Sequence, residues 1–178
     1  MSSMRHDNRG VSLVEITIVV AIIAVVGAVG ITSFNAMTGK PAQQCAQKLV
    51  YSLEKHRTTS VSRVGAYYVL SYNAATKEIV AEEFVSNDLT AGYSSVGKSV
   101  IGASNVEVTY YVDGDATAYN LNSGAIRLSF DRSSGAFKPL SSTNTATDGK
   151  YCTKIVASRG GRDFEVTLVP FTGKVYID

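Results

Sequence analysis

The chain has 178 residues, 18% of them charged, and a formal net charge of +2. This length suffices for one compact domain beyond an N-terminal segment. A nearly neutral chain suits packing against copies of itself and argues against a strong electrostatic grip on nucleic acid. Two histidines and two distant cysteines cannot supply a metal site. We also expect no cofactor and no catalytic residue.

The N-terminal segment combines a basic leader with a long apolar run. Arg5 and Arg9 precede Gly10, and a lone Glu15 opens a stretch from Ile16 to Ile31 without charge. Such a run is of membrane-spanning length. A carboxylate at its mouth is costly in lipid, so it normally has a partner and a function.

This layout, RG followed by VSLVE, resembles the signal of type IV prepilins and pseudopilins. The resemblance implies that a prepilin peptidase cuts between Gly10 and Val11, that Val11 becomes N-methylated, and that the apolar helix stays in the mature protein. It also implies that Glu15 serves assembly with other pilin subunits on the assembly platform of a pilus or type II secretion machine. The precursor would cross the inner or cytoplasmic membrane once, and the assembled filament would be extracellular or periplasmic. An ordinary secretory signal would be cut after its apolar stretch; a plain membrane anchor is the alternative.

The helical pattern continues beyond the apolar run. Apolar positions recur every three or four residues at Cys45, Leu49, Leu53 and His56, which predicts an amphipathic helix. We expect one helix from about Leu13 to about Arg63, roughly 75 Å long, with a kink or a restart at 38–41 because of Pro41.

After residue 64 the period changes to two. The predicted strands are 66–73, 77–85, 106–113, 125–131, 152–158, 163–169 and 173–178. Turn pairs such as Asp113-Gly114 and Gly160-Gly161 separate them. We therefore predict an α+β fold: a long N-terminal helix, apolar in its first half and amphipathic in its second, packed on antiparallel sheet. The expected parts are a leader (1–10), a transmembrane or filament-core half-helix (11–40) and a globular head (41–178).

Two further stretches refine the resemblance. Three segments are similar to minor pseudopilin H and the T-type minor pilins. They are AQKLVYSLEKHRTTSVSRVGAYYVLSY, AIRLSFDRSSGAF and the C-terminal FTGKVYID. The pilin fold and a minor structural subunit are what this resemblance implies. T-type minor pilins can bind DNA through a basic C-terminal pattern, which leaves a DNA-binding minor pilin as an alternative. Here the expected pattern holds Lys174 but has Tyr176 in place of a second basic residue. The neighbouring basic residues then make a solvated face: Lys150, Lys154, Arg159 and Arg162.

Other constellations point away from an enzyme. Gly92–Ser99 matches the P-loop pattern, but that motif needs a strand before it and a helix after it. Since no helix is expected after it, we predict a flexible surface loop, and a nucleotide-binding protein is a remote alternative. His56 is expected to be a packed residue with one hydrogen bond. Glu82 and Glu83 would lie on opposite faces of a strand, as on a solvated edge.

The two cysteines admit two interpretations. Cys45 would lie on the sheet-facing side of the helix and Cys152 at the start of a strand, so they can meet. In an exported protein they would then form a disulfide. Alternatively, they are two buried thiols that act as small hydrophobes.

Overall fold

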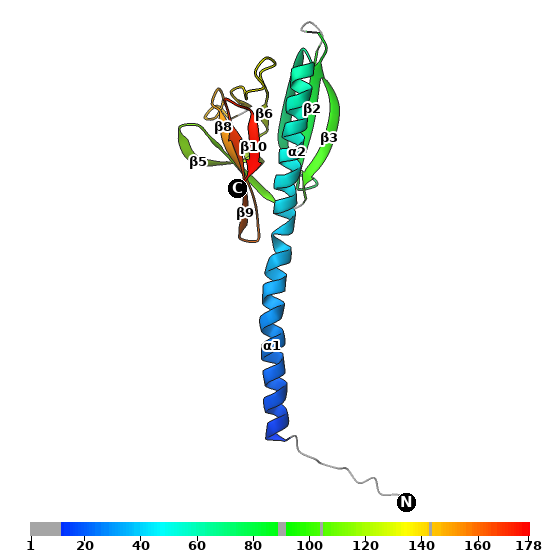
Figure 1. The fold of residues 1–178 in the computed structure, drawn as a ribbon, viewed down its shortest axis with the longest axis vertical. Helices are drawn as coiled ribbons and strands as arrows, with labels where there is room; N and C mark the ends of the chain where they lie inside the picture. Colours follow the sequence, from blue (N-terminus) through cyan, green and yellow to red (C-terminus); the bar gives the residue numbers. More distant parts are fainter. Residues whose placement is uncertain (1–11, 89–91, 104, 143) are drawn as a thin grey trace, which may run out of the picture. The chain divides into compact units, whose positions relative to one another are not determined.

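The structure is a computed structural model that describes residues 12–88, 92–103, 105–142 and 144–178, without the side chains of 27–38. The chain separates into two compact units, Met1–Met37 and Thr38–Asp178. The first unit contains nearly all of helix α1 (Leu13–Thr38). The second contains helix α2 (Lys40–Ser62) and all the described strands (Figure 1).

The helical part consists of two helices, so the prediction of one helix from about Leu13 to about Arg63 is wrong. α1 ends at Thr38, the chain bends at Gly39, and α2 begins at Lys40 with Pro41 in its first turn. Proline has no N–H to donate and clashes with a preceding helical turn, whereas it fits the first turn of a new helix. The predicted interruption at 38–41 is confirmed.

The expected membrane pass is also corrected. Within the residues that the structure describes, no helix is long and apolar enough to cross a membrane. A single-pass location in the inner or cytoplasmic membrane is therefore not supported.

The strands of the second unit form two antiparallel five-stranded sheets. One sheet has the order β3-β2-β1-β6-β7 and the other the order β10-β9-β8-β4-β5. The first contains β1 (Gly65–Asn73), β2 (Glu78–Ser86), β3 (Ser94–Gly102), β6 (Ile126–Leu128) and β7 (Ser141–Ser142). The second contains β4 (Glu107–Val112), β5 (Asp115–Asn120), β8 (Cys152–Arg159), β9 (Arg162–Val169) and β10 (Lys174–Ile177). A 3₁₀ turn, η1 (Leu121–Ser123), follows β5.

The predicted fold class is therefore wrong. Ten strands in two sheets make the described chain mainly β, whereas we expected a long helix packed on antiparallel sheet. The seven predicted strands are present, although β6 is shorter than predicted. The strands β3, β5 and β7 were missed because Gly, Asp, Asn, Ala and Lys, which are depleted in strands, occur often in β3 and β5, and β7 has only two residues.

Helix α2 joins the two sheets through one hydrophobic core. It contacts β1 and β3 of one sheet and β8, β9 and β10 of the other. The predicted apolar face is confirmed, because Cys45, Leu49, Leu53 and His56 are all buried. They belong to a continuous cluster that includes Leu70 and Ile79 of one sheet, and Ile155 and Val166 of the other. Burying this surface is the main favourable contribution to folding.

A single arginine adds a polar connection beside this core. The Arg57 guanidinium of α2 donates from Nε to the Gly135 carbonyl at 3.0 Å and from a terminal nitrogen to the Thr172 carbonyl at 2.9 Å. Gly135 follows β6 of one sheet, and Thr172 lies between β9 and β10 of the other. Both turns therefore depend on one side chain.

Candidate functional site

The most exposed apolar surface of the described chain is helix α1. Ten large aliphatic side chains between its start and residue 26 are 49–81% exposed. They are Leu13, Val14, Ile16, Ile18, Val19, Val20, Ile22, Ile23, Val25 and Val26. Thr17 does not interrupt this surface, because its hydroxyl donates to the Leu13 carbonyl at 2.8 Å. Apolar surfaces of this size mark interaction sites.

Glu15 is the only charged residue in this helix, and it lies in the first turn. A carboxylate there interacts favourably with the helix dipole. Its side chain is exposed and so can accept hydrogen bonds from a cation on another molecule. The cleavage site that we predicted, Gly10 and Val11, lies outside the described residues.

The two cysteines are free thiols in the structure, and both are buried. The predicted disulfide between Cys45 and Cys152 is absent, which agrees with the alternative of two small buried hydrophobes. Cys45 packs beside Gly102, where a Cβ would lie 3.0 Å from its sulfur. Cys152 begins β8, and its Sγ donates to the Lys154 carbonyl at 3.7 Å. Burial raises the pKa of each thiol to about 12.

The P-loop pattern does not form a phosphate-binding loop, and the prediction of a flexible surface loop there is wrong. Most of Gly92–Ser99 belongs to β3, the edge strand that pairs antiparallel with β2. Lys98 stands opposite Glu82 across the two strands. An extended strand with no helix after it cannot gather successive N–H groups around a phosphate.

A buried polar cluster that the sequence did not predict lies between α2 and β2. His56 is 1% exposed, and its Nδ1 lies 2.8 Å from Glu83 Oε1. Its Nε2 lies 3.3 Å from the Ser60 hydroxyl. The prediction that Glu83 lies on a solvated edge is therefore wrong. β3 pairs with β2 and is itself the edge strand of the sheet. Burial lowers the pKa of His56, and its hydrogen bond to the Glu83 carboxylate opposes this effect.

The order hydroxyl, imidazole and carboxylate is that of a serine hydrolase, but this cluster lies in the core. Ser60 is 3% exposed and lies one helical turn from His56 on the same helix. We therefore interpret the cluster as a buried hydrogen-bond network that connects α2 with β2. No feature of sequence spacing could have found it, since Glu83 is 27 positions away from His56.

The basic residues near the C-terminus do not form one free cationic patch. Lys150 lies 3.5 Å from Asp115, and Lys154 lies 3.2 Å from Glu165. Lys154 also stacks on the ring of Tyr111 at 4.7 Å. These contacts reduce the charge that Lys150 and Lys154 can offer to a phosphate backbone. Among the described residues, no three ligating side chains come together as a metal site.

No protein-family model, curated protein or solved structure matches this chain. Of the sites above, α1 with Glu15 has the most exposed aliphatic surface among the described residues.

Proposed function

We propose that the protein is a structural subunit of a type IV pilus or pilus-like secretion filament, in which copies associate through α1. The observation that carries the proposal is the exposed aliphatic surface of Leu13–Val26. Fully burying one such side chain contributes about 1.5–3 kcal/mol. Ten of them therefore supply a large driving force for association between helices.

The partner of α1 is a second copy of the same helix. A helix that is apolar on all sides suits the interior of a bundle, where every face meets a neighbour. The head forms its own core around α2, so assembly does not require it to unfold. Other pilin-like chains with the same kind of helix are acceptable neighbours on the same physical grounds.

Glu15 sets the register between copies in this proposal. Removal of residues 1–10 by a prepilin peptidase gives Val11 a new ammonium group. That cation on one subunit forms a charge-assisted hydrogen bond with Glu15 of the next, in surroundings that contain little water. A helix that stops short leaves both charges without partners, so one axial position is favoured.

The test compares Glu15→Ala and Glu15→Gln with wild type. Filaments are separated by high-speed sedimentation, seen by negative-stain electron microscopy, and the chain in them is quantified. We expect both variants to be folded but strongly depleted from filaments, since glutamine keeps the shape and loses the charge. Glu54→Ala, which removes an exposed glutamate of α2, is the matched control and should assemble normally. Wild-type recovery of Glu15→Ala would refute the pairing.

A further inference from the structure

Residues of α2, β1 and β6 line a basic pocket in the second unit of the chain. Its volume is about 350 Å³, and its lining includes Arg127, Arg132, Lys138, Tyr67 and Tyr93. No acidic residue lines it. Pockets of about 300–1,000 Å³ are typical of small-molecule sites.

The strand pattern explains why the cations gather here. In β6, Ile126 and Leu128 are buried whereas Arg127 is exposed. Ser129 continues this alternation, and the Lys138 N–H donates to its carbonyl at 2.8 Å. Lys138 therefore lies next to Ser129, close to the face of β6 that carries Arg127. Arg132 belongs to the turn between the segment of Ser129 and the segment of Lys138.

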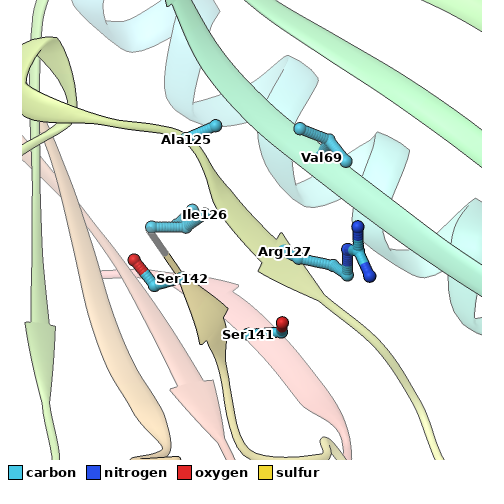
Figure 2. Close-up of a pocket in the computed structure, with 6 residues that line it drawn as sticks. All are labelled: Val69, Ala125, Ile126, Arg127, Ser141 and Ser142. Atoms are coloured by element: carbon cyan, nitrogen blue, oxygen red, sulfur yellow. The ribbon is translucent and has the colours of Figure 1, made fainter. Parts of the chain in front are cut away.

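Arg127 also lines a second, smaller cavity of about 190 Å³ together with Ser141. Figure 2 shows the Arg127 side chain extending from β6 toward β1, with Val69 beside it and the two serines of β7 across β6. Because the two cavities share Arg127 and Ser141, they adjoin at this arginine.

The Arg127 guanidinium is held by an aromatic ring. It lies 4.0 Å from the centroid of Tyr67, and Tyr67 in turn stacks on Phe84 with centroids 4.8 Å apart. Stacking fixes the plane of the guanidinium and leaves the N–H groups at its edge able to donate. Such an arginine is prepared for a two-point contact with an oxyanion.

The three cations have no anionic partner in the described part of the chain. No carboxylate there forms an ion pair with Arg127, Arg132 or Lys138, whereas Lys150 and Lys154 each have one. Three like charges around one pocket repel one another, and an anionic ligand relieves this repulsion.

We propose that this pocket binds a phosphate monoester of a small organic group. A monoester carries a charge of about −1.5 to −2 near neutral pH, which suits three cations better than a monocarboxylate does. The half-exposed ring of Tyr93 lies over Gly65 and against Tyr67 at 4.7 Å, where it can cover the organic part. This site is independent of the proposed assembly through α1.

The test is isothermal titration calorimetry of the full chain with inorganic phosphate, glycerol 3-phosphate and acetate. We expect saturable binding of one molecule per chain for the two phosphates and at least about tenfold weaker binding of acetate. Arg127→Gln should weaken phosphate binding by about 10-fold to 100-fold, as expected for lost hydrogen bonds to a charged group. Arg127→Lys should weaken phosphate binding by most of the same factor, because lysine lacks the planar guanidinium that stacks on Tyr67 and donates two parallel hydrogen bonds.

The control is Lys174→Gln, which removes an exposed lysine of β10 and should leave phosphate binding unchanged. Equal weakening by Lys174→Gln, or unchanged binding in Arg127→Gln, would overturn the proposal, as would absence of saturable phosphate binding in the wild-type chain. Tighter binding of a thymidine oligonucleotide, with equal losses in both variants, would replace it with nonspecific attraction of polyanions.

Discussion

The imidazole of His56 and the carboxylate of Glu83 meet at 2.8 Å between α2 and β2. The rings of Tyr68 and Phe130 lie 5.6 Å and 5.8 Å from the imidazole, so this polar contact is surrounded by the apolar core. A buried polar pair of this kind costs free energy if either partner is removed. It therefore fixes which residue of α2 faces which residue of β2.

The stability of the protein should depend on pH through His56. In the unfolded chain this histidine takes up a proton near its ordinary pKa of 6.5, and burial lowers its pKa in the folded chain. Between these two values the unfolded chain binds more protons, so the free energy of unfolding falls as the pH falls below about 6.5. We expect the urea midpoint to drop between about pH 7.5 and about pH 5.5.

His56→Gln should flatten this dependence, although the variant is less stable at every pH because Glu83 loses its partner. His6 is unchanged in the variant and so cancels in the comparison. The carboxyls of Asp115 and Asp131 stay ionised in this range, because hydrogen bonds from nearby residues lower their pKa. The same slope in both proteins would contradict the assignment.

Loss of Arg57 should loosen both turns that it contacts. Arg57→Ala leaves the carbonyls of Gly135 and Thr172 without their side-chain donor, and we expect a loss of about 1–3 kcal/mol in the free energy of unfolding. Equilibrium urea unfolding measures this. Lys55→Ala, at an exposed position of the same helix, should change stability by less than about 0.5 kcal/mol. Equal effects of the two substitutions would show that the contacts contribute nothing.

The thiols should be unreactive in the folded protein. Because the thiolate is the reactive form and burial raises the pKa of Cys45 and Cys152 to about 12, a disulfide reagent at about pH 8 should find neither. In denaturant without reductant it should find two thiols per chain. A count of zero in denaturant would instead establish the disulfide that the structure lacks.

Processing should remove the leader. Coexpression with a prepilin peptidase is expected to give a chain that begins at Val11 and carries one extra methyl group, which intact mass spectrometry detects. Gly10→Phe should leave the precursor uncut. A chain that still begins at Met1, or one cut after Phe34, would contradict the prediction and weaken the filament proposal.

The parts of the fold that sequence predicts are those with local causes. The buried face of α2 follows from the spacing of Cys45, Leu49 and Leu53, and the β8–β9 hairpin follows from Gly160 and Gly161, which both have positive φ. The break between the helices follows from Pro41. Each of these depends on a few consecutive residues.

What sequence did not predict depends on pairing between distant segments. β3 is a strand because β2 offers it hydrogen bonds, despite its Ser, Gly and Lys content. The contact of His56 with Glu83 and the stacking of Arg127 on Tyr67 join residues from separate elements. The basic pocket was missed for the same reason, because its three cations meet only after the strands pair.

The turns of Gly135 and Gly173 approach each other so closely that they restrict which substitutions evolution can accept. Gly173 has a φ of +66°, and a Cβ at this position would overlap the Gly135 carbonyl oxygen while lying 3.0 Å from Arg57 Nε. Evolution therefore cannot place another residue at 173 without rebuilding both turns. Arg57, Gly135 and Gly173 should change together or not at all in any lineage that keeps this head. Arg57 lies 78 positions from Gly135 and 115 positions from Thr172, the two residues whose carbonyls it bonds. The widely spaced triplet of Arg57, Gly135 and Gly173 is therefore a better sign of common ancestry than the apolar helix, because many unrelated chains can have such a helix.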